Sequence, residues 1–173
     1  MSDRPILIVF LGGMGGSPIE ELLSRALAEA GLDLVEEALA TGAFAQAVLV
    51  SDSDALASRL PSGAVLDRDV GPFHFGRRLA TLVGERGIRR PVYVGAGGVP
   101  LLRGSDLAAI AHHLHESTNV VIANNYFSAD LVAFTPGDAL QRIELPASDN
   151  LLPRCCGAAP RSSTSTRRPT WRS

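Results

Sequence analysis

Six short apolar segments alternate with amphipathic helical patterns along this chain, and the alternation limits the folds open to it more than any other feature. The segments that predict strands are residues 6–11, 46–52, 63–69, 91–97, 119–125 and 130–136. The patterns that predict helices are residues 19–31, 33–42, 53–60, 75–87 and 105–116. Strands separated by such helices form right-handed crossovers, so we expect a three-layer α/β/α fold around a mainly parallel, twisted sheet. No helical pattern separates the last two predicted strands, and one of them should therefore run antiparallel.

The composition is that of a single globular domain. The chain has 173 residues, of which 46% are apolar and 20% charged, and both fractions are ordinary for such proteins. A formal net charge of -2, with no basic stripe before residue 150, argues against a nucleic-acid partner. No apolar segment is long enough to span a membrane, and the first residues lack a signal-peptide pattern. We therefore expect a cytoplasmic protein with no membrane partner.

The composition changes abruptly at Arg154, where the sequence becomes RCCGAAPRSSTSTRRPTWRS. This segment has many arginines, no acidic residue and almost no aliphatic one, which is typical of a disordered basic tail. Its adjacent cysteines, Cys155 and Cys156, indicate neither a disulfide framework nor a metal site. We expect a domain over residues 1–153 and a tail over residues 154–173.

A glycine-rich loop follows the first predicted strand and leads into the first predicted helix. It comprises Leu11, Gly12, Gly13, Gly15, Gly16 and Ser17. Ser17 is suited to cap the helix, with a proline and an acidic residue directly after it. A strand, a glycine turn and a helix N-terminus can together bind an anion, because backbone N–H groups and the helix dipole point at one place. The alternative is a tight turn that needs positive φ and binds nothing.

Acidic side chains lie at the ends of two other predicted strands. In parallel sheets ligands bind beyond the carboxyl ends of the strands, where the strand order reverses. Asp52, Asp67 and Asp69 lie at such ends and could serve a bound nucleotide with Mg²⁺, which prefers oxygen ligands. For Asp52 the favoured interpretation is a cap on the helix predicted at 53–60. For Asp67 and Asp69, capping and ligand binding are weighted equally.

The order of these segments resembles the MobA-like nucleotidyltransferases, a family with the GT-A type of α/β fold. The resemblance rests on VFLGG (9–13), VLVSD (48–52), DVGPFHFGRRLATL (69–82) and VYVGAGGVPLLRGSDLAAIA (92–111), within residues 5–150. It implies that the chain binds a nucleoside triphosphate and Mg²⁺ and transfers a nucleotidyl group to a small phosphorylated or cofactor acceptor. The glycine loop, Asp52 and Asp67 would contact the nucleotide, and Asp69 the metal. The implied acceptor side comprises Pro100, Asn124, Asn125 and Asp130.

The chain departs from the family at two positions that matter for catalysis. Catalytic members carry a basic pair after the first glycines, whereas this chain contains no lysine. They also carry a metal-binding aspartate where this chain has Gly98. Arg77 or Arg78 could replace the missing basic group, because guanidinium groups bind phosphate well, although at least one is expected on a solvated helix face. A non-catalytic protein that binds a nucleotide or sugar nucleotide is therefore the alternative, and a dinucleotide-binding protein ranks last because no G-x-G-x-x-G is present.

A shifted reading frame offers a second interpretation of the tail. One base earlier, the codons of residues 162–173 are compatible with Q-F-N-I-D-T-P-T-D-V-A-I, and the family closes with an I-D-T-P-x-D-L stretch. In that case the fold would be incomplete at its C-terminus. We keep this as a hypothesis that sequencing of the DNA can test.

Histidines and turn residues offer further candidates. His112 and Glu116 are four residues apart on a predicted helix, but a surface helix end is favoured over a metal site. His74 could face a ligand or order its loop. Asn124, Asn125 and Asp130 could close a hairpin through turn chemistry instead of binding an acceptor, and this alternative needs no ligand.

Overall fold

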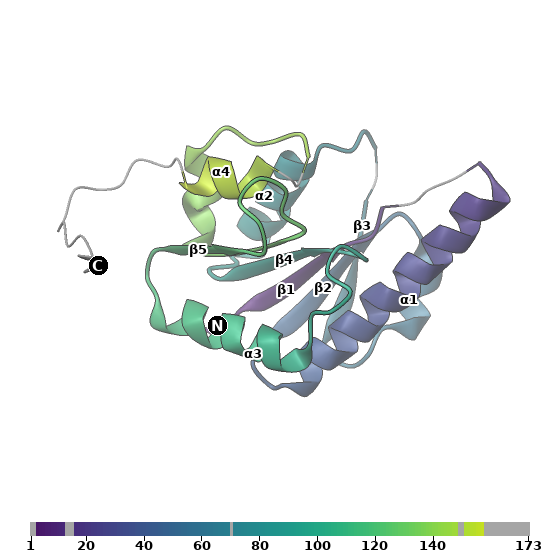
Figure 1. The fold of residues 1–173 in the computed structure, drawn as a ribbon, viewed down its shortest axis with the longest axis horizontal. Coiled ribbons are helices and arrows are strands. Elements are labelled where there is room, and N and C mark those ends of the chain that lie inside the picture. Colours follow the sequence, from purple (N-terminus) through teal and green to yellow (C-terminus); the bar gives the residue numbers. More distant parts are fainter. Residues whose placement is uncertain (1–2, 13–15, 70, 149–150, 158–173) are drawn as a thin grey trace, which may run out of the picture.

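The computed structural model describes residues 3–12, 16–69, 71–148 and 151–157. They form a six-stranded sheet with the strand order β3-β2-β1-β4-β6-β5, seen in Figure 1. The strands are β1 (Ile6–Phe10), β2 (Gln46–Ser51), β3 (Ala64–Arg68), β4 (Pro91–Gly95), β5 (Val120–Ala123) and β6 (Leu131–Thr135). The pairs β1–β2, β1–β4 and β2–β3 are parallel, whereas β6 runs antiparallel to both β4 and β5. The predicted mainly parallel α/β sheet, in which one of the last two strands of the chain runs antiparallel, is thus confirmed.

Helices cover both faces of this sheet (Figure 1). One face carries α1 (Pro18–Ala40) and α3 (Gly104–Glu116), and the other carries α2 (Phe75–Glu85), η2 (Gly137–Arg142) and α4 (Leu152–Gly157). Successive residues of a strand point to opposite faces, so Leu7 and Val9 of β1 join the α1–α3 core while Ile8 and Phe10 join the α2 core. None of the described helices is both long and apolar enough to cross a membrane.

The helix α1 replaces two predicted helices. The patterns at 19–31 and 33–42 form one continuous helix of 23 residues, so the predicted break at Gly31 is wrong. Gly31 is buried inside the helix, and a Cβ built on it would lie 3.1 Å from Cδ2 of Leu11. Because glycine has no side chain, α1 can pack closely against Leu11, the residue directly after β1. The pattern at 53–60 forms the short 3₁₀ helix η1 (Asp54–Arg59) and no α-helix.

The strand order reverses between β1 and β4. The chain passes from β1 outward to β2 and β3, and then returns to the other side of β1 with β4. Phe10 pairs with Gly95 at the carboxyl ends of the two strands, and the N–H of Ala96 donates to the carbonyl of Phe10 at 3.1 Å. The loops that follow β1 and β4 therefore leave the sheet side by side, at the point where α/β proteins bind ligands.

The helix α4 extends past the expected domain boundary at residue 153. Leu152 is fully buried, and Cys156 is 8% exposed in the core beneath α2. Burial and the neighbouring Cys155 raise the pKa of the Cys156 thiol to about 12, so this cysteine stays protonated at neutral pH and is no nucleophile. Residues 158–173, the remainder of the expected tail, lie outside the described residues.

Candidate functional site

The described glycines of the loop after β1 are Gly12 and Gly16. Gly12 is exposed, and a Cβ built on it would meet no atom within 4 Å. Gly16 has φ of +129°, a conformation that favours glycine. Gly13 and Gly15 lie outside the described residues. The side chain of Leu11 is buried against α1, so a nucleotide could meet only the backbone of this residue.

Ser17 caps α1 in a reciprocal arrangement with Glu20. The hydroxyl of Ser17 accepts from the N–H of Glu20 at 3.3 Å, and Oε2 of Glu20 accepts from the N–H and the hydroxyl of Ser17, both at 3.0 Å. This capping box satisfies helix N–H groups within the chain. It also places a carboxylate at the end of the helix where a phosphate was expected. The predicted cap is confirmed, and its electrostatic consequence is a helix terminus that already holds negative charge.

The turn after β4 brings Gly98 against Asp130. The N–H of Gly98 donates to the carbonyl of Gly95 at 3.1 Å. A Cβ built on Gly98 would lie 2.3 Å from Cβ, 2.5 Å from Cγ and 2.8 Å from Oδ1 of Asp130. The side chain of Asp130 thus fills the space that any side chain at position 98 would need. Pro100, farther along the same loop, is exposed.

Asn124 fixes the backbone that carries Asp130. Its Oδ1 accepts from the N–H groups of Asp130 and Leu131, both at 3.1 Å, and Oδ1 of Asn125 accepts from the N–H of Phe127 at 2.9 Å. Both asparagines therefore close the hairpin, as the alternative interpretation proposed. The N–H of Gly95 donates to the carbonyl of Asp130 at 2.8 Å, which joins this hairpin to the end of β4.

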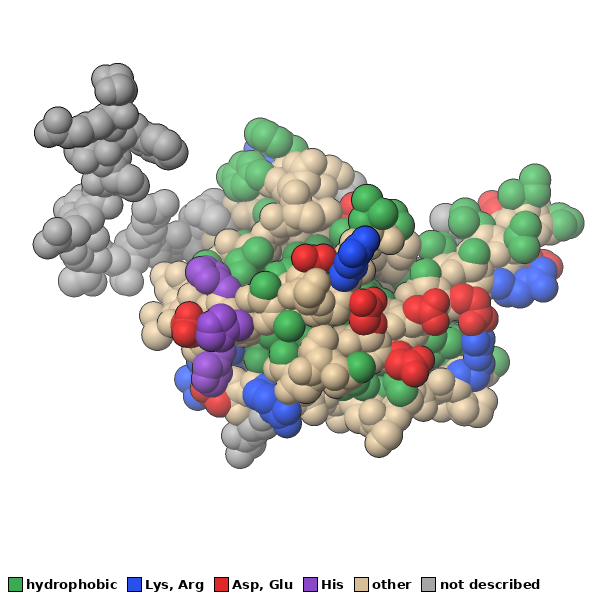
Figure 2. Space-filling view, turned by 60° about the horizontal axis from the view of Figure 1, so that its bottom comes forward, with side chains coloured by type: hydrophobic (Ala, Val, Ile, Leu, Met, Phe, Trp, Pro, Cys, Tyr) green, Lys and Arg blue, Asp and Glu red, His purple; other side chains and the backbone are tan. Residues whose placement is uncertain are grey.

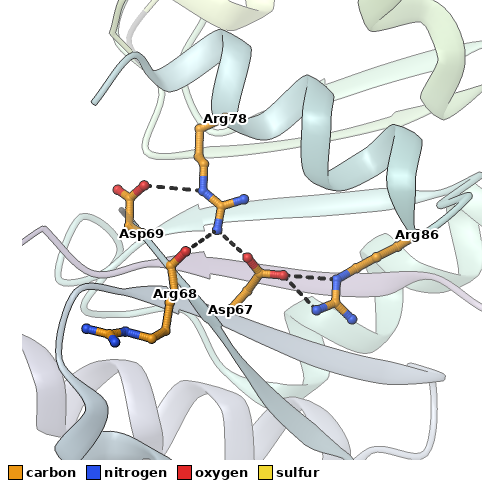
Figure 3. A network of polar contacts seen from close by, with 5 residues as sticks. All are labelled: Asp67, Arg68, Asp69, Arg78 and Arg86. Carbon is orange, nitrogen blue, oxygen red and sulfur yellow. Dashed lines mark hydrogen bonds and ion pairs between the residues drawn. The ribbon is translucent and has the colours of Figure 1, made fainter. Parts of the chain in front are cut away.

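A network of arginines and aspartates joins β3 to α2 (Figure 3). Arg78 donates to the carboxylate of Asp67, to Oδ1 of Asp69 at 3.3 Å and to the carbonyl of Arg68 at 3.1 Å. Arg86 donates to Oδ2 of Asp67 from Nη2 at 2.6 Å and from Nε at 3.2 Å. Arg78 and Asp67 are 17% and 22% exposed in their side chains. The network is therefore a partly buried connection between the sheet and the helix that covers it.

The position of Asp67 explains this pairing. Asp67 is the next-to-last residue of β3, at the carboxyl end where the sequence placed it, and lies opposite Val50 of β2. Burial raises the pKa of its carboxyl, but the hydrogen bonds and charges of Arg78 and Arg86 outweigh burial and hold that pKa below its ordinary value. A ligand at Asp67 or Asp69 would have to compete with a guanidinium that already neutralises both.

Asp52 does not cap the helix that follows it. Ser53 is the N-cap of η1 and makes no side-chain capping bond, so the favoured interpretation of Asp52 is wrong. The carboxylate of Asp52 is exposed, and its carbonyl accepts from Arg68 at 3.4 Å.

Phe73 is a residue near the switch point that the sequence did not single out. Its ring meets the ring of Phe10 edge to face, with centroids 6.1 Å apart, yet Phe73 is 57% exposed. Phe10 also contacts the rings of Phe75 and Tyr93. An exposed ring on a rigid aromatic base offers a surface for a planar ligand. Its only sequence signal was an aromatic residue in a Gly-Pro loop.

A separate groove lies next to α3, near the amino ends of β1 and β2, at the opposite end of these strands from the switch point. Its volume is about 240 Å³, and its lining consists of Arg4, Pro5, Ala43, Ala108, Ala111, His112 and His115. Figure 2 shows this side of the molecule, with the histidines gathered toward one end. His112 pairs with Glu116 at 3.4 Å, and both are exposed, as the surface-helix interpretation predicted. His74 caps α2 by accepting from the N–H of Arg77 at 3.4 Å.

The described residues contain no group of three or more histidines, cysteines or acidic residues that could hold a metal ion. Mg²⁺, however, usually takes only one or two protein carboxylates and completes its shell with water and substrate phosphates. Asp130 fits such a role, because its carboxylate lies at the switch point and makes no hydrogen bond or ion pair with any described residue. Asp69, the expected ligand, is bound by Arg78.

Solved structures share this fold. A protein of Desulfovibrio desulfuricans G20 that has been assigned as a nucleotide-diphospho-sugar transferase is similar with a TM-score of 0.62 and 12% identity, over 89% of this chain and 75% of that one. A CMP:2-keto-3-deoxy-manno-octonic acid synthetase complexed with CTP is similar with a TM-score of 0.50 and 12% identity, over 80% and 76% of the two chains. The 4-diphosphocytidyl-2C-methyl-D-erythritol synthase of Anaerococcus prevotii DSM 20548 is similar with a TM-score of 0.52 and 14% identity, over 80% and 73%.

No family model matches the sequence, and no curated protein matches it either. At 11–14% identity the solved structures establish the architecture alone. The function has to be inferred from this chain's own residues. The fold implied by the resemblance is thus confirmed: the chain has the architecture of these nucleotide-diphospho-sugar transferase and cytidylyltransferase structures.

Proposed function

We propose that this protein binds a nucleoside triphosphate at the β1–β4 switch point and transfers its nucleotidyl group to a small phosphorylated or cofactor acceptor. One observation carries the proposal: two glycine-containing loops lie where the strand order reverses, together with the carboxylate of Asp130, which pairs with no described residue. This is the place where open α/β sheets bind nucleotides. The complex of a protein with the same fold and CTP supports the same class of ligand.

The phosphates are assigned to the loop after β1. Gly12 is open on its Cα side, so its backbone can approach a phosphate without a side chain in the way. Arg77, exposed in the first turn of α2, is the arginine of its pair that remains available, because Arg78 is bound by Asp67 and Asp69. The ring of Phe73 provides the surface against which the base can stack.

The reaction is a displacement at the α-phosphorus. An oxygen of the acceptor forms a bond to this phosphorus, the bond to the bridging oxygen of the β-phosphate breaks, and pyrophosphate leaves with the electron pair. A magnesium ion, when bound, neutralises charge that develops on the phosphates. The acceptor is assigned to the side of Pro100, Asn124, Asn125 and Asp130, where the loop after β4 and the β5–β6 hairpin lie together.

A second candidate is nucleotide binding without catalysis. The capping box of Ser17 and Glu20 favours it, because the helix N-terminus that could stabilise a triphosphate already holds a carboxylate. The absence of lysine from the chain points the same way.

Two assays on the purified protein separate these candidates. Isothermal titration with ATP, GTP, CTP and UTP measures binding, and coupled detection of pyrophosphate in the presence of sugar phosphates measures transfer. The proposal expects one triphosphate to bind and release pyrophosphate when an acceptor is added. Arg77→Ala should weaken that binding, and Arg59→Ala, remote on η1, should not. Binding without pyrophosphate release from any acceptor would favour the second candidate, and binding of none of the four would refute both.

A further inference from the structure

We propose that Asp130 is the carboxylate that contacts the divalent cation of a bound Mg·NTP, in the space that a side chain at position 98 would otherwise occupy. The inference rests on the proposed function, since the cation arrives with the nucleotide. It assigns to Asp130 the metal role expected of Asp69.

The side chains at positions 98 and 130 exclude one another. Every distance from a Cβ built on Gly98 to Cβ, Cγ and Oδ1 of Asp130 is below 3.0 Å, from 2.3 to 2.8 Å. Real Cβ atoms essentially never approach other heavy atoms so closely, so only one of the two positions can carry a side chain there. The fold therefore admits a carboxylate at this place either from the loop after β4 or from the residue before β6, and this chain supplies it from the latter.

The backbone of Asp130 is held in place, whereas its carboxylate has no partner among the described residues. Its backbone N–H is bound by Asn124 at 3.1 Å, and its carbonyl accepts from Gly95 at 2.8 Å. The side chain is half-buried and makes no hydrogen bond or ion pair with any residue that the structure describes. Asp67 and Asp69, in contrast, are neutralised by Arg78. A carboxylate at the switch point that pairs with no described residue is suited to an incoming cation.

The number of protein ligands agrees with this role. Mg²⁺ in nucleotide sites keeps several waters and takes most of its remaining ligands from the phosphates, with one or two carboxylates from the protein. The three atoms nearest to a Cβ built on Gly98 all belong to Asp130, so the glycine leaves this space to the carboxylate.

The test measures the affinity for the triphosphate with Mg²⁺ and in EDTA. The variants are Asp130→Asn, which keeps the shape, Asp69→Asn as the matched control, and the exchange Gly98→Asp/Asp130→Gly. Isothermal titration gives affinities without any need for turnover. Water-proton relaxation with Mn²⁺ in place of Mg²⁺ reports the bound cation directly.

Wild type and Asp69→Asn should bind the triphosphate more tightly with Mg²⁺ than in EDTA. Asp130→Asn should lose most of this gain, about tenfold or more, because even groups that only support metal ligands change metal affinity by that factor. It should bind the metal-free triphosphate at least as well as wild type. The exchange variant should recover part of the gain, since it returns a carboxylate to the same space.

Equal gains from Mg²⁺ in wild type and Asp130→Asn would overturn the inference while leaving the proposed function intact. Loss of the gain in Asp69→Asn alone would return the metal role to Asp69. Absence of binding in EDTA and in Mg²⁺ alike would refute the proposed function, and the inference with it.

Discussion

The guanidinium of Arg78 bridges the carboxylates of Asp67 and Asp69, and it lies between β3 and α2 (Figure 3). The sequence left both aspartates open between capping a helix and binding a ligand, and in the fold their pairing with Arg78 attaches a helix to the sheet. The carboxylate of Asp130, at the switch point, pairs with no residue that the structure describes. The predictions below rest on this difference between the paired acids and the acid that we propose as a metal ligand.

Replacing Arg78 should destabilise the protein. Arg78→Met keeps much of the apolar stem but leaves Asp69 without its partner and Asp67 with Arg86 alone. We expect a loss of about 1–2 kcal/mol in the free energy of unfolding, because the pair retains contact with solvent and a fully buried pair would cost roughly 3–5 kcal/mol. Urea unfolding measures it. Arg59→Met, which breaks the exposed pair with Glu29, is the control and should change stability less; an equal change would contradict the account.

The contribution of Asp67 should depend on pH. Its pKa is held below the ordinary value in the folded protein, so its ionised form stabilises the fold above the pKa of the unfolded chain, about 3.9. That stability is lost as the pH falls through the folded pKa. The difference in unfolding free energy between wild type and Asp67→Asn should therefore be largest near neutral pH and shrink below about pH 4. A difference in unfolding free energy that increased as the pH fell would contradict this expectation.

Positions 98 and 130 should be coupled in stability. Gly98→Ala should cost about 1–3 kcal/mol, as overpacking does, because its Cβ would lie 2.3 Å from Cβ of Asp130. In the Asp130→Gly background the same change should cost much less. Gly84→Ala, whose Cβ would meet nothing within 4 Å, is the control and should be neutral or stabilising. Thermal unfolding of the four cycle members measures the coupling, and additive effects would show that the two side chains do not compete for this space.

Glu20 should weaken the binding of a triphosphate. Glu20→Gln can retain the bonds to Ser17 while it removes a negative charge from the N-terminus of α1. Charges at a helix terminus are worth about 0.3–1 kcal/mol, so affinity should rise about two- to fivefold. Glu36→Gln, on the same helix but far from that end, should have no effect. Equal or weaker binding by Glu20→Gln would place the phosphates elsewhere than the loop after β1.

The layers of the fold could be predicted from the sequence, because the period of apolar residues directly reflects which faces are buried. All six strands appear within a few residues of their predicted bounds. The break in α1 was predicted wrongly because Gly31 suggests a helix end, whereas contact with Leu11 keeps it inside the helix. The residue pattern within a segment does not reveal such a contact with a segment distant in the sequence.

The candidate site was harder to predict for a related reason. Asp67 lies at the end of β3, but Arg78 and Arg86 bind its carboxylate. The sequence could not show this, because the face that a strand residue occupies is fixed only in the completed sheet. The contact between Gly98 and Asp130 joins the loop after β4 to the loop before β6, and nothing in the sequence marks the two residues as neighbours. Turn chemistry, in contrast, is local, and the role of Ser17 as a cap and of Asn124 in a hairpin followed from it.

Nuclear magnetic resonance titration of the ¹⁵N-labelled protein with the Mg²⁺ complex of each nucleoside triphosphate tests the central claim most directly. The account predicts saturable shifts for the amides of Gly12, Ala96 to Gly98 and Asp130, which surround the β1–β4 switch point. Amides beside the groove of Arg4, His112 and His115 should stay unchanged. Shifts confined to that groove, or no shifts with any of the four triphosphates, would contradict a nucleotide site at the switch point.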